Sequence, residues 1–149
     1  MIAGRLLSIC YKAVICLSRE ILLVLPFPVS ANRYWRNVKG RMIKSEKARL
    51  YQNDIKNRFK IETFADCAIE LKIDLYRPKK MGDLDNYLKV TIDSLKGICF
   101  NDDKQVRKIT AEMFDDKDYP RCEVLIQEYV SKWQRAKRLI PKSEPNEIM

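Results

Sequence analysis

Five aspartates and a lysine are concentrated within about twenty residues of a chain whose net charge is +9. They occupy two segments, Gly82-Asp83-Leu84-Asp85-Asn86-Tyr87-Leu88-Lys89 and, after Asp93, Phe100-Asn101-Asp102-Asp103-Lys104-Gln105-Val106. Clustered carboxylates repel one another unless a cation lies among them, and hard divalent metals prefer such oxygen ligands. The positive surface around them would attract a polyanion. This combination is typical of metal-dependent nucleases.

The first pair of acids has the spacing of metal ligands. Asp83 and Asp85 lie where a predicted strand passes into a predicted helix, and residues two apart in an extended segment point the same way. Asp102 or Asp103 would reach the same ion if the chain doubles back after the helix. Mg²⁺ suits this site, with Mn²⁺ as an alternative, because it binds few carboxylates and accepts phosphate oxygens. A bound Mg²⁺ lowers the pKa of its water and offsets phosphate charge.

Lys89 follows Asp85 by one helical turn, within reach of the scissile phosphate or the leaving oxygen. Each residue also has a purely structural interpretation. Asp85 is a candidate helix N-cap, and Lys89 a surface partner of Asp85 worth only about 0.3–0.5 kcal/mol. Asp102 and Asp103 are candidates for turn residues, and Asp93 for a helix-surface or supporting residue. For each residue considered alone, the structural role is favoured. Considered together, acids on both sides of a helix that carries a lysine favour a metal-dependent active site.

The charge of the chain is unevenly distributed. Lysine and arginine number 29 against 20 acids, and residues 25–60 contain ten basic residues and two acidic ones. This favours contact with nucleic-acid phosphates, although part of it is a solvated helix face. The chain has no histidine, which excludes Ser-His-Asp and Cys-His sites and a histidine base. Five cysteines without a C-x-x-C pair argue against zinc and for a reducing compartment.

Hydrophobic patterns predict the elements that position these residues. Apolar runs and alternation predict four strands, at residues 21–25, 67–76, 106–114 and 122–129. Two helices are predicted at residues 45–61 and 86–96, the first capped by Ser45. Their apolar faces comprise Ala48, Tyr51, Ile55 and Phe59, and Leu88, Thr91, Ile92 and Leu95. Residues 30–40 are predicted to be a loop, and residues 115–118 a hairpin loop. We therefore expect an α+β domain with a small mixed sheet and two main helices.

The two ends of the chain are expected to lie outside this domain, which spans residues 21–130. Residues 1–20 are apolar but interrupted by Arg5 and Lys12, too short and broken to cross a membrane. They are interpreted as a leader outside the core, with a short helix packed on the body as the alternative. Residues 131–149 are interpreted as a basic and polar tail that frays.

The acidic segments resemble the RusA family of Holliday junction resolvases. The family pattern is an acidic D-x-D-N, a lysine on the following helix, and a later D-D-x-Q-V. The segment Leu25-Pro26-Phe27-Pro28-Val29-Ser30-Ala31-Asn32-Arg33-Tyr34-Trp35-Arg36 is similar to the opening strand of the family and its P-x-P-x-S-x-N-x-Y-x-R motif. The resemblance covers residues 21–129. Where the family carries a run of arginines, this chain has Arg77-Pro78-Lys79-Lys80-Met81-Gly82.

This resemblance implies a homodimeric, Mg²⁺-dependent endonuclease of the cytoplasm, with a bacterial, phage or prophage origin. Such an enzyme nicks two opposing strands of a four-way DNA junction symmetrically and leaves 5′-phosphate and 3′-hydroxyl ends. By motif position, Asp83, Asp85 and Asp103 would be the catalytic metal ligands and Lys89 the functional lysine. Asp102 and Asp93 would be supporting residues.

The DNA contacts are expected from the basic and aromatic residues near the acids, namely Arg33, Tyr34, Trp35, Arg36, Arg41, Lys79 and Lys80. Exposed Tyr34 and Trp35 would stack on unpaired bases at the branch point; alternatively, Trp35 packs in the core. A two-fold dimer would present two sites to two symmetric phosphates. Two other functions stay open, a looser nuclease for branched DNA and a junction-binding protein without activity.

Overall fold

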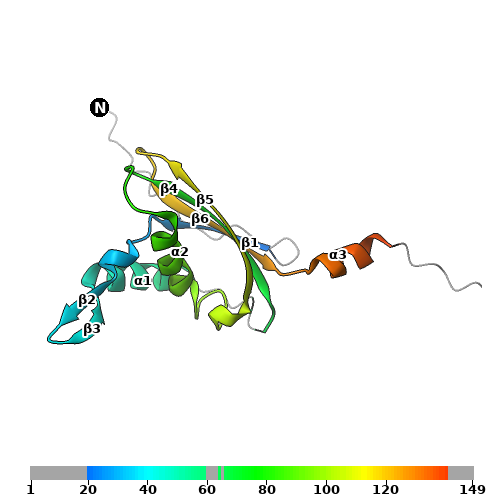
Figure 1. Ribbon diagram of the computed structural model, residues 1–149, viewed down its shortest axis with the longest axis horizontal. Coiled ribbons are helices and arrows are strands. Elements are labelled where there is room, and N and C mark those ends of the chain that lie inside the picture. Colours follow the sequence, from blue (N-terminus) through cyan, green and yellow to red (C-terminus); the bar gives the residue numbers. More distant parts are fainter. Residues whose placement is uncertain (1–19, 60–63, 65, 141–149) are drawn as a thin grey trace, which may run out of the picture.

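A four-stranded mixed sheet is the centre of the molecule (Figure 1). The computed structural model describes residues 20–59, 64 and 66–140. In spatial order the strands are β1 (Glu20–Pro26), β6 (Arg121–Glu128), β4 (Ile69–Arg77) and β5 (Val106–Asp115). β4 and β5 are parallel, whereas β6 runs antiparallel to both β1 and β4. The predicted α+β fold with a mixed sheet and two main helices is confirmed.

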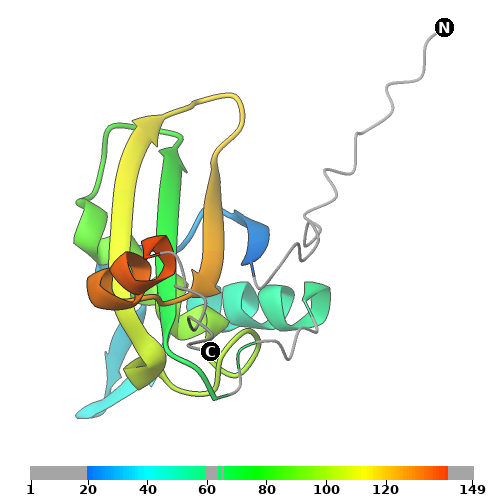
Figure 2. The ribbon, with the colours of Figure 1, turned by 90° about the vertical axis from the view of Figure 1, so that its right-hand side faces the viewer.

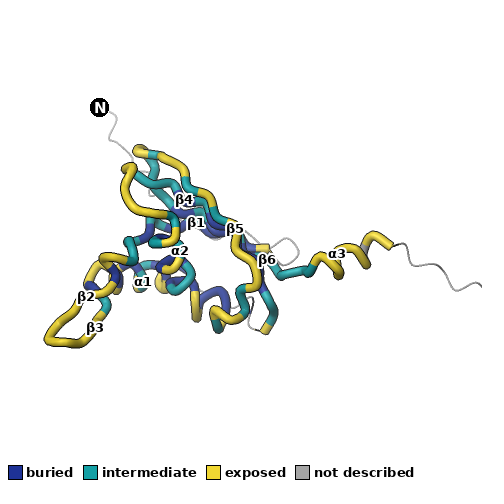
Figure 3. The backbone as a smooth tube through the Cα atoms, in the orientation of Figure 1, coloured by how far each residue is buried: buried dark blue, intermediate teal, exposed yellow. Residues whose placement is uncertain are grey.

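One face of the sheet forms the core. Alternate residues of β1, β6 and β4 are fully buried on this face, among them Leu23, Leu25, Leu71, Ile73, Leu75, Val124 and Ile126. This follows from the two-residue period of a strand, which sends successive side chains to opposite faces. The helices α1 (Glu46–Arg58) and α2 (Leu84–Leu95) cover the buried face (Figure 3).

α1 begins where the sequence predicts. The Ser45 hydroxyl oxygen accepts a hydrogen bond from the Ala48 N–H at 3.2 Å, so the predicted N-cap is confirmed. Ala48, Tyr51 and Ile55 face the core, as their helical spacing indicates. The helix ends at Arg58, earlier than predicted, and residues 60–61 lie outside the described residues.

The predicted loop at residues 30–40 is wrong in its second half. A short 3-10 helix, η1 (Ala31–Arg33), leads into a hairpin of β2 (Trp35–Val38) and β3 (Arg41–Lys44) that projects from the body (Figure 1). Lys39 and Gly40, both with positive φ, make its two-residue turn. All of β2 is exposed, so the alternation that reveals a half-buried strand is missing from its sequence.

The predicted hairpin between the last two strands is also wrong. β5 and β6 are consecutive in sequence, but β4 lies between them in the sheet. α2 carries the chain from β4 to β5 as a crossover, which is how parallel neighbours are joined. β6 then pairs with the other side of β4, and both edges of β4 are hydrogen-bonded.

The chain after Ser131 forms a helix, α3 (Lys132–Leu139), and this part of the predicted fraying tail is wrong. Ser131 and Gln134 form a capping box that stabilises its start. α3 lies on the side of the sheet opposite α1 and α2 (Figure 2). The predicted leader lies outside the described residues except for Glu20, as do residues 141–149. No helix in the described part of the chain is long and apolar enough to cross a membrane.

A buried acid, Glu70 of β4, anchors α3 to this second face. Its side chain is only 1% exposed and accepts hydrogen bonds from Lys108 at 2.6 Å, Gln127 at 3.1 Å and Arg135 at 3.2 Å. The hydrogen bond from Lys108 outweighs burial and lowers the pKa of Glu70 from its ordinary value of 4.5. An ionised Glu70 is therefore part of the folded state.

We expect Glu70→Gln to lower the free energy of unfolding by about 1–2 kcal/mol at neutral pH, because its cationic partners are half exposed and lose only part of their interaction energy. A lowered pKa stabilises the fold above the unfolded-state pKa, and this is lost as the pH falls through the folded-state pKa. The difference from wild type should therefore shrink below pH 4.5. Urea unfolding at several pH values measures this difference in the free energy of unfolding, and Glu112→Gln, at an exposed position, is the control. A difference independent of pH would contradict this account.

Candidate active site

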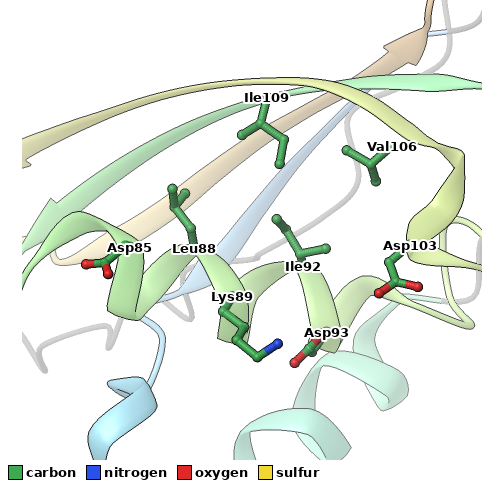
Figure 4. A pocket seen from close by; sticks show the side chains of 8 residues that line it. All are labelled: Asp85, Leu88, Lys89, Ile92, Asp93, Asp103, Val106 and Ile109. Atoms are coloured by element: carbon green, nitrogen blue, oxygen red, sulfur yellow. The ribbon is translucent and has the colours of Figure 1, made fainter.

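A groove of about 420 Å³ between α2 and β5 contains four of the charged residues singled out by the sequence. Asp85, Lys89 and Asp93 come from α2, and Asp103 from the 3-10 helix η2 (Asp103–Gln105). Its apolar wall consists of Leu88, Ile92, Val106 and Ile109 (Figure 4). The groove brings the first and second acidic segments to one surface.

The helical repeat of α2 aligns its three charged residues. Asp85, Lys89 and Asp93 are spaced by four and therefore lie on one face of the helix. Thr91 and Leu95 are buried, but Leu88 and Ile92 are only half buried, because they line the groove. The helix predicted from the spacing of these four residues is confirmed, and its face is divided between the core and the groove.

The start of α2 differs from the sequence prediction. Asp83 is the N-cap, with extended backbone angles, whereas Asp85 lies in the first helical turn. The structural interpretation of Asp85 as the cap is therefore wrong, and only Asp83 occupies the extended segment. The Asp83 side chain makes no capping hydrogen bond. Both carboxylates are exposed at a helix N-terminus, which favours negative charge.

Neither Asp83 nor Asp85 takes part in any of the ion pairs found between described residues, and Lys89 is likewise absent from them. The surface pair of Asp85 and Lys89 that the sequence offered as an alternative is therefore not formed within the described part of the chain. These three groups are accessible to a ligand from solvent.

The second acidic segment divides its two aspartates between different roles. Asp102 caps η2, accepting a hydrogen bond from the Lys104 N–H at 3.1 Å, while Gln105 accepts one from the Asp102 N–H at 3.0 Å. Its structural interpretation as a turn residue is confirmed. Asp103 instead faces the groove and pairs with the Lys96 ammonium at 3.2 Å.

Lys96 is the residue that sequence reasoning missed. It is the C-cap of α2, seven residues before Asp103, and no motif identifies it. A hydrogen bond with the Asp102 carboxyl, and then the Lys96 ammonium, hold the pKa of the Asp103 carboxyl at about 2. Asp103 in turn raises the pKa of Lys96. Asp103 is therefore ionised at any physiological pH.

We expect Lys96→Gln to raise the pKa of Asp103, because removal of the ammonium destabilises its carboxylate. Carbon-detected NMR of the aspartate carboxyl groups against pH measures this value directly. Lys104→Gln, which removes a neighbouring exposed lysine, is the matched control. The pKa of Asp103 should be lower in Lys104→Gln than in Lys96→Gln. An Asp103 pKa unchanged in Lys96→Gln would show that the ion pair does not form in solution.

The chemistry of the acids suits Mg²⁺, which takes one or two protein carboxylates and otherwise keeps water and phosphate oxygens. Asp83 and Asp85 are exposed and two residues apart at the start of α2, so they offer such a pair. Asp103 lies toward the other end of the helix (Figure 4). Among the described residues, no three metal-binding side chains meet in one cluster.

The predicted DNA-contacting residues are exposed with one exception. The exposed set comprises Arg33, Trp35, Arg36, Arg41, Lys79 and Lys80. Trp35 is 43% exposed, so its alternative placement in the core is wrong. Tyr34 is buried, and its hydroxyl accepts a hydrogen bond from Gln52 at 2.6 Å. The prediction that Tyr34 stacks on bases is corrected: its side chain anchors the base of the hairpin. Burial, and then the charge of Asp93, raise the pKa of Tyr34.

Comparison with protein families gives one match over most of the chain. Residues 26–127 match the family described as Endodeoxyribonuclease RusA. This span includes the hairpin, both main helices and both acidic segments.

Comparison with individual proteins agrees. The chain is 33% identical over 101 residues to a crossover junction endodeoxyribonuclease of Enterobacteria phage HK97, which covers 65% of this chain and 78% of the relative. It is 30% identical over 89 residues to proteins of the same description from Escherichia coli K12 and Shigella sonnei Ss046, covering 56% of this chain and 74% of each relative.

Proposed function

The chain belongs to the RusA family of endodeoxyribonucleases, and from this premise we propose that it resolves four-way DNA junctions by paired, metal-dependent nicks. One observation supports this most strongly. The D-x-D-N segment begins α2 and the D-D-x-Q-V segment forms η2 and leads into β5, and both contribute carboxylates to the same groove. An acidic groove in a protein of net charge +9 suits an ion that works on a polyanion.

The residues in and beside the groove take the following roles in this proposal. Asp83 and Asp85 would hold Mg²⁺, or Mn²⁺ in its place, and Asp103, which lies toward the other end of α2 in this structure, would be its third ligand in the complex with DNA. When bound, the ion supplies an activated water and neutralises charge on the phosphate. Lys89, on the same helix face as Asp85, contacts the scissile phosphate. Lys96 orients the Asp103 carboxylate, Asp102 supports it by capping η2, and Asp93 lines the groove as a supporting residue.

The proposed substrate and oligomeric state are inferred from the relatives, which are described as crossover junction endodeoxyribonucleases. We propose that two copies of the chain form a two-fold dimer, because such a dimer offers two sites to the two symmetric strands of a junction. Exposed cations of the hairpin and of the loop before α2 bind phosphates and orient the DNA without reading its sequence.

Cleavage of a synthetic four-way junction beside a linear duplex of the same sequence tests the proposal. In Mg²⁺ we expect paired symmetric nicks in the junction alone, with 5′-phosphate and 3′-hydroxyl ends, and no cleavage in EDTA. Equal cutting of flaps and forks would support a looser nuclease for branched DNA. Binding without cleavage in Mg²⁺ or Mn²⁺ would support a binding protein and contradict the proposed activity.

A further inference from the structure

A second hollow, of about 470 Å³, adjoins the start of α2. It lies between the segment that follows β1 and the loop that joins β4 to α2. Three cations line it from three separate elements, namely Arg33 of η1, Lys47 of α1 and Lys79 of the loop. None of the described residues that line it is acidic. The hollow therefore selects for an anionic group.

The hollow also has apolar walls, which an inorganic anion would not need. The rings of Phe27 and Tyr87 lie in it with centroids 4.8 Å apart, and Met81 stands at its rim with 62% of its surface exposed. Ser30 and Asn32 add hydrogen-bonding groups. Phosphate-binding cations beside aromatic and apolar surfaces match the two ends of a nucleotide.

The walls of the hollow are held in place. The Tyr87 hydroxyl donates a hydrogen bond to the Met81 carbonyl at 3.0 Å, and the Tyr51 hydroxyl donates one to the Pro26 carbonyl at 2.9 Å. Gly82, also in the lining, is followed directly by Asp83. A ligand in the hollow therefore lies next to the carboxylates at the start of α2.

The cationic surface continues beyond this hollow. A neighbouring hollow of about 320 Å³ shares Asn32, Arg33 and Lys47 with it and extends to Trp35 and Arg36 at the base of the hairpin. Glu46 is the acid in its lining. Arg33 and Lys47 thus line both hollows, and the smaller hollow reaches the exposed indole of Trp35.

We propose that the larger hollow binds one unstacked nucleotide of the substrate DNA, adjacent to the phosphate that is cleaved. This inference rests on the proposed function. Arg33, Lys47 and Lys79 bind the phosphate, and the base lies against the apolar wall; the strand then passes over the smaller hollow toward Trp35. The volume lies within the roughly 300–1,000 Å³ of ligand pockets. Extrusion costs least where a base lacks a stable stacked pair, as at a branch point.

Fluorescence of 2-aminopurine, which rises when the base unstacks, tests this proposal. The analogue is placed in turn at the positions flanking the branch point, and the junction is saturated with wild-type protein in EDTA, so that the DNA stays uncut. We expect a rise of severalfold at one of these positions on each symmetric strand, and no rise with the linear duplex.

Two variants test separately the positive charge of the larger hollow and the open volume that would hold the base. Arg33→Ala/Lys47→Ala should lower junction affinity about tenfold and flatten its salt dependence, because two phosphate contacts are lost. Asn32→Trp keeps the charge but fills the space, so it should abolish the fluorescence rise at saturation. Arg49→Ala/Lys56→Ala removes equal charge from exposed positions of α1 outside both hollows and should retain the rise.

A wild-type complex that forms without any fluorescence rise would overturn the nucleotide site while leaving the resolvase proposal intact. A rise that persists in Asn32→Trp would overturn it equally, since the base would unstack elsewhere. Equal affinity for junction and linear duplex would instead overturn the proposed function itself. Circular dichroism of each variant verifies that these surface substitutions leave the fold unchanged.

Discussion

Replacing Asp85 by asparagine is expected to slow cleavage of a four-way junction at least about 100-fold, equivalent to about 2.7 kcal/mol of transition-state stabilisation. Asp85 is an exposed carboxylate that lines the acidic groove and has no ion-pair partner among the described residues. Asparagine keeps its size but loses the charge that a divalent ion requires. Junction affinity should change less than about threefold, because other residues contact the phosphates.

Single-turnover cleavage and a binding titration in EDTA measure the two effects separately. Asp83→Asn and Asp103→Asn should behave in the same way if all three carboxylates serve one ion. Asp118→Asn, in the exposed connection between β5 and β6, removes an equivalent charge away from the groove and should cut at the wild-type rate. Wild-type cleavage by Asp85→Asn would show that the site lies elsewhere.

Replacing Gly82 by alanine is expected to lower the free energy of unfolding by about 2–4 kcal/mol, from a strained backbone plus steric overlap. Gly82 has a φ of +83°, where side chains other than glycine are unfavourable. An added Cβ would overlap the Tyr87 hydroxyl oxygen and ring edge. Tyr87 is a buried residue of α2, so the loop before Asp83 would have to move. Cleavage should therefore fall together with stability.

Gly40→Ala provides a control with the same backbone strain and no overlap. Its φ is +78°, and nothing lies within 4 Å of an added Cβ. We expect it to cost about 1–2 kcal/mol, from backbone strain alone. Introducing Tyr87→Phe beside Gly82→Ala removes the closest clashing atom and should recover part of the lost stability. Urea denaturation measures all four proteins, and equal losses from the two glycines would contradict the role of Tyr87.

Gly82→Ala and Asp85→Asn change residues on either side of Asp83, where the loop passes into α2. The loop that ends at Gly82 carries Lys79 and Met81 toward the cationic hollow, and Asp83 then begins the helix whose acids line the groove. A DNA strand bound across this point would meet cations on one side and carboxylates on the other. This separation of the cationic hollow from the acidic groove explains how a strongly basic protein can keep an acidic site beside a polyanion.

Features that depend on neighbours along the chain could be predicted from the amino-acid sequence. Ser45 marks the start of α1 because its hydroxyl needs only the N–H three residues later. The alternation in β4 identifies a strand with a buried face, because successive side chains point to opposite sides. The acidic motifs, the lysine between them and the family resemblance were equally visible, since all are short and continuous.

Features that depend on distant partners became clear from the three-dimensional fold. β4 separates β5 from β6, because α2 carries the chain across to a parallel neighbour, whereas the sequence order suggested a hairpin. Tyr34 is buried by its contact with Gln52, eighteen residues away. Lys96 pairs with Asp103 because the chain turns back after α2. Hydrogen bonding and packing between separate elements fix these arrangements, so the pattern within one element does not specify its partner.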